Sequence, residues 1–451
     1  MQQIEDIIVA GANLVWGMPL LVLLLGGGMF FMFYSRFLPF RFFGHAVNVL
    51  RGKYDNEDDP GQINHFQALS GHLAATIGMG NISGVALAIA AGGPGAIFWM
   101  WVSAFFGMAT KFFTCTLAVM YRGKDSEGEL QGGPMYVITE GLGKNWKPLA
   151  VFFSVACLIG ATPVFQANQM VAALKDVVLV PNGIESGFGL DLVIGLVIAV
   201  LVALVILGGI QRIGLVAARL VPSMVILYVV SVLVILLSNA SDILPSLTLI
   251  VEDAFTAQAA LGGAVGAIVI EGAKRAAFSN EAGIGTAPMM HGAAKTKEPV
   301  REGLVAMIGP AVDTLLICTM TGLCILITGV WTLKETNGIT LTAQAFDMSL
   351  PVVGPYALVL SVMVFAITTI FGLAYYGRKC FSFLFGAKYG QYFNYWYVML
   401  VLIGSVSTLD LVVNIVFIGY GLMAIPTMIS ALLLAPKALG AAKTYFNSLS
   451  T

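Results

Sequence analysis

Charge is scarce in this chain, and the few charged residues mostly fall in short segments between long apolar runs. Only 10% of the 451 residues are charged, whereas 58% are hydrophobic, and the net charge is −1. A chain this apolar indicates a protein that crosses a lipid bilayer several times. No basic patch is present that could bind a nucleic acid, which excludes a nucleic-acid partner.

The sequence signatures of several enzyme classes are also missing. The chain has no glycine-rich nucleotide loop, no His or Cys cluster with metal-ligand spacing and no glycine-bounded serine nucleophile. We therefore expect no enzymatic activity, and we expect an ion gradient rather than ATP as the energy source. The five cysteines fall in or beside apolar runs and are interpreted as small packing residues: Cys115, Cys157, Cys318, Cys324 and Cys380.

Eleven apolar runs are long enough to be transmembrane helices. If the N-terminus lies outside, most of the 23 basic residues fall in loops on the cytoplasmic side, as the positive-inside rule requires. The sequence therefore predicts an all-α polytopic protein of the plasma membrane, with the N-terminus outside and the C-terminus in the cytoplasm. The expected spans are 13–34, 66–91, 96–120, 148–174, 191–209, 214–238, 254–273, 303–331, 355–377, 393–409 and 411–435.

The order of these spans predicts an internal repeat within one transmembrane domain. Residues 1–60 supply an extra helix and an inner loop, and residues 436–451 a cytoplasmic tail. The ten remaining helices divide into halves at 61–240 and 241–435, and the first helices of the two halves begin on opposite sides of the membrane. Two five-helix halves of opposite orientation form the inverted-repeat plan of many secondary transporters.

Two spans carry glycines near their midpoints. The stretch Ala74–Gly84 reads AATIGMGNISG, with Gly78, Gly80 and Asn81 within four residues, and residues 260–267 read ALGGAVGA. Glycine weakens a helix, and broken backbone inside a membrane survives only where protein or a wet cavity satisfies it. We predict that both helices are broken there; close helix packing by small residues is the alternative.

A broken helix exposes backbone groups that can bind ions. The amides of Gly78, Met79 and Gly80 favour a carboxylate, and the carbonyls of Ala74 and Ile77 favour a small cation. The ninth span offers further oxygens at the same depth. Its predicted sodium ligands are the Phe365 carbonyl and the hydroxyls of Thr368 and Thr369, although membrane threonines usually bond their own helix.

Polar residues in the fourth span suggest a lined cavity. Uncompensated amides are costly in lipid, so these side chains are expected to face the protein interior, where helix–helix contact is the alternative role. The full set of predicted substrate-binding residues is Thr76, Gly78, Met79, Gly80, Asn81, Phe165, Gln166, Asn168, Ala264, Ile268, Thr369 and Leu373.

A few ionisable residues fall within or beside the spans. Asp313 is a candidate for bracing a helix break, binding a cation or relaying protons. Lys111 and His72 are interpreted as snorkelling or packing residues nearer the inner side. Three further residues are candidates for an inner gate or an ion-pair network, with simple surface pairing as the alternative: Glu271, Arg275 and Glu281.

Several longer motifs resemble the alanine or glycine:cation symporter family of bacteria and archaea. They are TIGMGNISGVALAIAAGGPGAIFWMW (76–101), GGPMYVI (132–138), FSNEAGIGTAP (278–288) and DTLLICTMTGL (313–323). The resemblance implies a leucine-transporter-like fold with one extra N-terminal helix. It also implies a substrate carboxylate at Gly78–Gly80 and sodium at Ala74, Ile77, Phe365, Thr368 and Thr369.

Three positions depart from that family's pattern. The family often has an acid where this chain has Thr114, a tryptophan where it has Leu373, and a glutamate where it has Arg378. A smaller wall at Leu373 could admit a larger amino acid.

The sequence thus predicts a sodium-coupled symporter of small neutral amino acids, alanine and glycine first, which works by alternating access as a monomer. The alternatives are proton coupling, a larger neutral substrate such as glutamine, a channel or receptor on the same fold, and a membrane-embedded enzyme.

Overall fold

The computed structural model describes residues 2–255, 264–333 and 338–449, and almost all of its regular structure is helical. Within these ranges the strands are β1 (Gly123–Lys124) and β2 (Leu130–Gln131), which pair antiparallel in one small hairpin. Helices dominate because a helix satisfies its own backbone groups, which lipid cannot do.

The helices follow one another with short connections. The first half contains α1 (Gln2–Val15), α2 (Met18–Leu21), α3 (Gly27–Tyr34), α4 (Leu38–Arg41), α5 (Phe43–Leu50), α6 (His65–Thr76), α7 (Met79–Gly92), α8 (Gly95–Met120), α9 (Pro134–Tyr136), α10 (Lys147–Gly160), α11 (Val164–Leu174), α12 (Phe188–Ile206) and α13 (Gly209–Ser238). The second half contains α14 (Ala240–Ala254), α16 (Ala264–Asn280), α17 (Thr286–His291), α18 (Pro299–Ala306), α19 (Ile308–Pro310), α20 (Thr319–Ile327), α21 (Gly338–Ser349), α22 (Val353–Phe385), α23 (Gly390–Ser405) and α24 (Leu409–Leu449).

Several spans also contain wider or tighter helical turns. π-Helical segments lie at Val22–Gly26 (η1), Val137–Leu142 (η2), Lys175–Leu179 (η4) and Ala311–Cys318 (η6). Short 3₁₀ turns lie at Lys144–Trp146 (η3), Val180–Asn182 (η5), Val330–Thr332 (η7) and Ala387–Tyr389 (η8). Such π-segments are rare and frequently mark functional sites.

Six of the described helical segments are long and apolar enough to cross a membrane, and the number rises to nine if each of three bent helix pairs is one span. The protein is thus a multi-pass helical membrane protein, while the count of eleven spans and the inverted repeat stay predictions. One bent pair is α6 with α7, which meet at 43°. A second is α13 with α14, which meet at 99°.

The seventh predicted span needs correction. It was expected at 254–273, but Ala254 ends α14, and the next described helix, α16, runs from Ala264 to Asn280. After a short interruption α17 continues from Thr286 to His291. The apolar pattern ended this span at residue 273 because the residues that follow it are charged or small, although the protein buries them.

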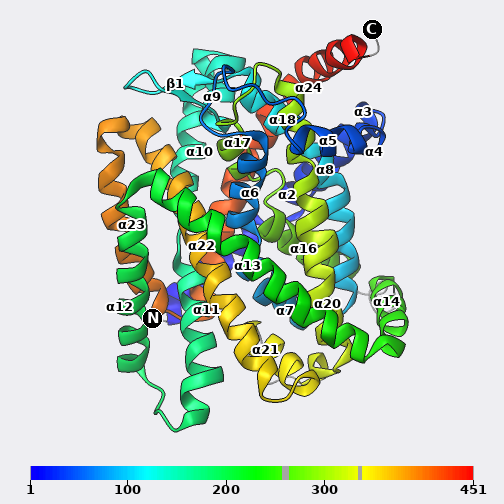
Figure 1. Cartoon of the computed structure of the whole chain (residues 1–451), viewed down its shortest axis with the longest axis vertical. Coiled ribbons are helices and arrows are strands. Elements are labelled where there is room, and N and C mark those ends of the chain that lie inside the picture. The colour runs from blue at the N-terminus through cyan, green and yellow to red at the C-terminus, as the bar shows by residue number, and fades with distance from the viewer. Residues whose placement is uncertain (1, 256–263, 334–337, 450–451) are drawn as a thin grey trace.

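The broken helices lie in the middle of the molecule. In Figure 1, α6 continues into α7 towards the lower part of the view, and α16 and α22 lie beside them. Helices α5, α9, α17 and α18 gather at the upper end, while α14 and α21 lie at the lower end. We call these the α17 end and the α21 end.

Helices α10 and α24 approach so closely that their backbones touch at Gly160 and Gly419. A Cβ atom added to Gly419 would fall onto the backbone of Gly160. We expect Gly419→Ala to destabilise the protein by about 1–3 kcal/mol because rigid backbone cannot move aside. Thermal unfolding in detergent measures this loss. Gly440→Ala on the same helix, where a Cβ meets nothing within 4 Å, is the control and should melt like the wild type.

Candidate functional site

The first predicted break is confirmed. Helix α6 ends at Thr76 and α7 begins at Met79, with Ile77 and Gly78 in non-helical conformations between them. The Gly78 amide donates to Asn81 Oδ1 at 2.9 Å, although in a continuous helix it would donate to the Ala74 carbonyl. The Ala74 carbonyl, which was predicted to bind sodium, therefore does not receive the Gly78 amide that would bond it in a continuous helix.

Helix α22 presents Thr369 to this break. A Cβ on Gly78 would fall onto Thr369 Oγ1 and would lie 3.6 Å from the Phe365 carbonyl oxygen. Thr369 Oγ1 is buried and has no hydrogen-bond partner among the described atoms. Buried hydroxyls are rarely left unpaired, so this oxygen is suited to a ligand that the structure does not contain.

The five predicted sodium ligands lie in these two adjoining segments. Thr368 Oγ1 donates to the carbonyls of Val364 and Phe365, both at 3.0 Å, which is the intrahelical bond usual for membrane threonines. Its lone pairs, the Thr369 hydroxyl and the nearby carbonyls form a set of neutral oxygen donors. Hard monovalent cations prefer such donors, so the residues present fit a sodium ion.

Asp313 connects the first break to the rest of the bundle. It lies in the π-helical segment η6 and is fully buried. Its carboxylate accepts from Asn81 Nδ2 at 2.8 Å, from Ser279 Oγ at 2.5 Å and from Thr314 Oγ1 at 2.8 Å. Because the Asn81 side chain also holds the Gly78 amide, Asp313 fixes the side chain that shapes the break.

A second break lies further along the chain than the segment in which the sequence pattern predicted one. Residues 256–263 lie outside the described residues, and the remainder of the predicted break, 264–267, is helical in α16. The backbone leaves the helix after Asn280, with φ of 57° at Glu281, 84° at Gly283 and 109° at Gly285. Only glycine adopts such angles easily, so this turn needs its two glycines.

Glu281 holds the second break in shape. Its carboxylate accepts from Tyr420 Oη at 2.7 Å and from the Thr286 hydroxyl. Glu281 therefore lies in the middle of the protein and not in the inner ion-pair network predicted for it.

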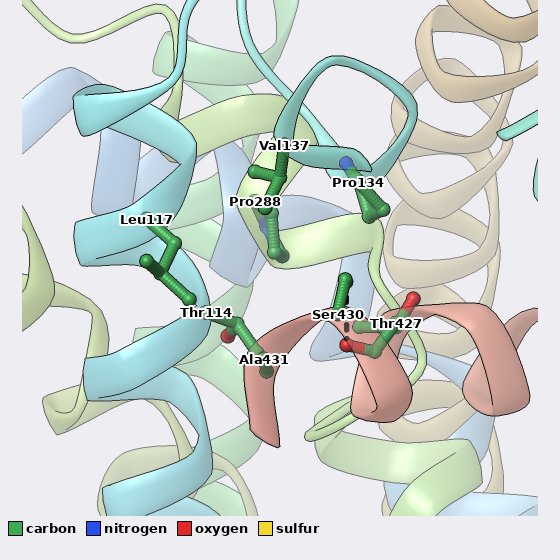
Figure 2. Close-up of a pocket in the computed structure, with 8 residues that line it drawn as sticks. All are labelled: Thr114, Leu117, Pro134, Val137, Pro288, Thr427, Ser430 and Ala431. Carbon is green, nitrogen blue, oxygen red and sulfur yellow. Dashed lines mark hydrogen bonds between the residues drawn. The ribbon is translucent and has the colours of Figure 1, made fainter. Parts of the chain in front are cut away.

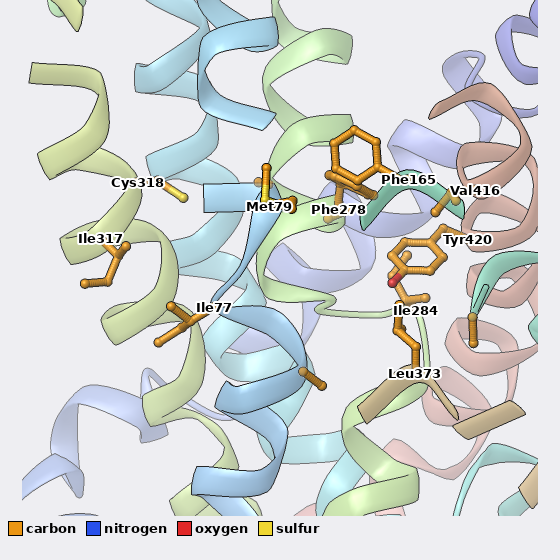
Figure 3. Close-up of a cluster of buried hydrophobic side chains, with 14 of the residues drawn as sticks. Ile77, Met79, Phe165, Phe278, Ile284, Ile317, Cys318, Leu373, Val416 and Tyr420 are labelled. Atoms are coloured by element: carbon orange, nitrogen blue, oxygen red, sulfur yellow. The ribbon is translucent and has the colours of Figure 1, made fainter. Parts of the chain in front are cut away.

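Apolar and aromatic side chains pack beside the two breaks (Figure 3). The Phe278 ring lies 5.1 Å from Phe165, 5.3 Å from Phe417 and 5.9 Å from Tyr420, measured between ring centroids. Met79 and Leu373 belong to the same hydrophobic cluster. Close by in sequence, Gln166 Oε1 is buried without a hydrogen-bond partner among the described atoms. Three of the predicted substrate residues, Met79, Phe165 and Leu373, are thus buried in the hydrophobic core that Figure 3 shows.

Three other predicted substrate residues are not brought to the break. Asn168 Nδ2 donates to the Ser407 carbonyl at 2.7 Å, between α23 and α24, so it joins helices. Ala264 and Ile268 lie in α16, about 22 Å and 16 Å along the helix axis from Ser279, which contacts the break. Ala264 and Ile268 were chosen because a break was expected at 260–267, so they lie far from the break that the structure shows.

The predicted gate pair Glu271 and Arg275 lies at the α21 end. Arg275 Nε donates to Glu271 Oε1 at 2.5 Å, and Glu271 packs against Gly92, the last residue of α7. Lys274 Nζ lies 4.2 Å from the centroid of the Phe417 ring. Ala294, by contrast, forms a bridge with Ile63 at the opposite end, and the role of Glu271 and Arg275 as a gate or ion-pair network stays a prediction.

A small cavity lies between α8, α17 and α24, beside the second break, where Gly285 contacts the lining residues Pro134 and Thr427 (Figure 2). Thr114, where the resembling family often has an acid, lines it, and the Thr114 hydroxyl donates to the Thr110 carbonyl at 2.9 Å. Its lining is Thr114, Leu117, Pro134, Val137, Pro288, Thr427, Ser430 and Ala431.

The sequence reasoning missed a buried polar chain at the α17 end. The Glu302 carboxylate accepts from Nδ1 of His65 and, at 2.5 Å, from Nδ1 of His291. Nearby, Lys111 Nζ lies 2.6 Å from His72 Nε2. Lys111 is 1% exposed, which excludes the snorkelling role and leaves the packing role that was the other expectation for it.

Every residue from 74 to 86 is buried, so the first break is closed to solvent at both ends of the molecule. Such an occluded arrangement suits a site that opens alternately to each side.

Comparison with known proteins agrees with this geometry. The model of the sodium:alanine symporter family matches residues 1–451. The sodium/alanine symporter AgcS of Methanococcus maripaludis is 42% identical over 96% of this chain and 95% of its own. From Bacillus subtilis, the probable sodium/glutamine symporter GlnT is 36% identical over 99% and 91% of the two chains, and the putative sodium/proton-dependent alanine carrier YrbD is 35% identical over 97% and 92%.

A solved structure, MhsT in complex with L-phenylalanine, shares the fold. It has a TM-score of 0.59 and 13% identity, and the match covers 84% of this chain and 98% of that one. The leucine-transporter-like fold expected from the sequence is therefore confirmed, and the protein is a transporter rather than an enzyme. With a family model that spans every residue and a relative of this similarity, the chain belongs to the sodium:alanine symporter family.

Proposed function

We propose that this protein couples the entry of small neutral amino acids, alanine and glycine first, to the inward movement of sodium. The observation that carries the proposal is the buried, unpartnered Thr369 hydroxyl against the Gly78 break. The name of the relative AgcS, a sodium/alanine symporter, supports both the substrate and the ion.

The break suggests where the amino acid would bind. Met79 and Gly80 are the first residues of α7, and the first amides of a helix have no partner within it. These amides and the helix dipole favour the substrate carboxylate. The cluster of Met79, Phe165 and Leu373 would surround the side chain, and this apolar wall favours neutral amino acids over charged ones.

Sodium would bind on the other side of the break. The carbonyls of Ala74, Ile77 and Phe365 and the hydroxyls of Thr368 and Thr369 would replace its hydration shell. A cation at this position would hold α6 against α22, so that ion binding favours the closed site in which the amino acid is held. Coupling then follows because each ligand stabilises the arrangement that the other needs.

We further propose that a monomer suffices and that the N-terminus lies outside, so that the α17 end faces the cytoplasm. Glutamine is the second candidate substrate, because the relative GlnT is named a probable sodium/glutamine symporter and Leu373 leaves a smaller wall than tryptophan. Proton coupling is the second candidate for the ion, as the name of the relative YrbD suggests.

Uptake into proteoliposomes tests the proposal. We expect radiolabelled alanine to accumulate when sodium is imposed outside and to fail to accumulate when choline replaces sodium at fixed pH. Thr369→Ala should reduce sodium-driven uptake about tenfold, the effect of losing one buried ligand oxygen. Thr369→Ser, which keeps the hydroxyl, should retain most of it.

Thr328→Ala is the matched control, because that hydroxyl bonds only the Cys324 and Ile325 carbonyls of its own helix. Uptake that persists in choline would refute sodium coupling. Ion flux without accumulation of alanine against its gradient would indicate a channel instead.

A further inference from the structure

The α17 end of the molecule holds a buried carboxylate that joins three helices. Glu302 belongs to α18, His65 is the first residue of α6, and His291 is the last residue of α17. All three side chains are at most 1% exposed. Both α6 and α17 lie directly beyond a helix break, so Glu302 binds the far ends of the two segments that the breaks leave free to swing.

Each histidine depends on Glu302. Nε2 of both rings is buried without a hydrogen-bond partner among the described atoms, and His65 Nε2 lies 4.0 Å from Asp55 Oδ1. The bond from Nδ1 to Glu302 is thus the polar anchor of each ring. Within residues 2–255, 264–333 and 338–449, no three His, Cys, Asp or Glu side chains could share a metal ion, so the cluster does not serve as a metal site.

Backbone bonds tie α6 and α17 to each other in addition. Lys295 N donates to the Ile63 carbonyl at 2.6 Å, and Gln62 N donates to the Ala293 carbonyl at 2.8 Å. Arg122 joins this connection through the carbonyls of Gly292 and Ala294. The two segments therefore cannot separate without breaking both the backbone bonds and the Glu302 bonds.

The polar contacts of these segments with α22 involve no carboxylate. His72 Nδ1 lies 3.3 Å from Tyr376 Oη, Lys379 Nζ donates to the Met289 carbonyl at 2.8 Å, and Cys380 Sγ lies 3.7 Å from Met289 Sδ. The acceptors are neutral groups, which water can replace when the interface opens, although Ala75 of α6 also packs closely against Gly372 of α22. Stripping a buried carboxylate of its donors costs more than losing a neutral bond.

We propose that Glu302 is a positioning residue that holds α6 and α17 on α18, so that the three move as one unit and the site opens at this end along α22. The proposal rests on alternating access but not on the identity of the amino acid or the ion.

Native cysteines report which interface opens. Cys115 of α8 packs with Ala287 of α17 and Ala306 of α18, so it becomes accessible only if α17 leaves α18. Cys380 lies between α22 and α17, on the interface that we expect to open. Cys324 of α20 is buried elsewhere and serves as the reference for global unfolding.

The experiment labels the purified protein with N-ethylmaleimide, without sodium or amino acid, and reads each cysteine by mass spectrometry. In the wild type we expect Cys380 to react faster than Cys115. In Glu302→Ala, Cys115 should react about tenfold faster than in the wild type, because the bonds that held α17 and α6 are lost. Glu298→Gln, which removes a carboxylate from the same connection but neither histidine bond, should leave Cys115 protected.

If Cys324 also reacts in Glu302→Ala, that variant is unfolded, and two histidine variants test the proposal instead. His291→Ala removes the arm that holds α17 and should expose Cys115, whereas His291→Asn keeps a donor and should restore protection. A Cys115 that stays protected in folded His291→Ala, or that reacts as fast as Cys380 in the wild type, overturns the proposal. Because no substrate is used, such a result leaves the proposed transport activity untouched.

Discussion

Gly78→Ala is expected to abolish sodium-driven alanine uptake. The added Cβ would fall onto Thr369 Oγ1, with the Phe365 carbonyl oxygen 3.6 Å away on the same side. Thr369 would have to turn out of the position in which its hydroxyl faces the break. Overpacking of this kind costs about 1–3 kcal/mol, which corresponds to a loss of up to about a hundredfold in binding and uptake.

The measurement is uptake together with sodium-dependent binding of alanine to the purified protein. Gly84→Ala, further along α7, is the control, because a Cβ there meets only ordinary contacts at 3.5 Å or more. The double variant Gly78→Ala with Thr369→Ala removes the overlap, so its thermal stability should recover while uptake stays low. Wild-type uptake in Gly78→Ala would show that the break is not the transport site.

The first break could be predicted from the sequence, and the second could not. Around Gly78, two glycines and an asparagine stand close together inside an apolar run, and the Asn81 side chain caps the Gly78 amide. Around residues 260–267 the glycines are as dense, but the described part is helical. Glycine density alone cannot separate a break from close helix packing.

The true second break was hidden because its signal is polar. Glu281, Gly283 and Gly285 stand in a segment that carries charged residues on both sides, which resembles a loop. Burial of Glu281 by Tyr420 and Thr286 turns this segment into the middle of a span. Those partners belong to α24 and α17, and no local sequence pattern around Glu281 predicts them.

The Glu302 cluster shows the same limit more clearly. His65 and Glu302 are 237 residues apart, and each taken alone reads as an ordinary polar residue near a span end. Only the tertiary fold pairs them. Hydrophobic periodicity finds helices, but the partner of a buried ion depends on how the helices pack.

Asp313→Ala is expected to reduce sodium-dependent alanine binding about a hundredfold, because three buried donors lose their acceptor at once. Asn81 Nδ2 would keep its longer bonds to the residue 313 carbonyl at 3.1 Å and to Ser279 Oγ at 3.2 Å, so the side-chain oxygen that holds the Gly78 amide would be held less firmly. Ser279, which links α16 to the same carboxylate, would also lose its partner. Both broken helices would therefore lose their common support.

Asp313→Asn separates this structural role from proton relay. Asparagine keeps one acceptor oxygen in the same place, so a supporting role predicts a partial loss of about tenfold. A relay role predicts that Asp313→Asn still binds alanine but does not accumulate it, since asparagine cannot carry a proton. Asp347→Ala, which removes an exposed acid from α21, is the control and should bind alanine normally.

The pH dependence of uptake completes the test. If Asp313 only braces the two breaks, the remaining uptake of Asp313→Asn should follow the same pH profile as the wild type, because the titrating groups of the cycle are intact. If Asp313 carries the coupling proton, that variant should lose the response to a pH gradient while still binding alanine. The second result would indicate that a proton at Asp313, beside Asn81, drives transport. The proposal that a sodium ion at Thr369 drives it would then be wrong.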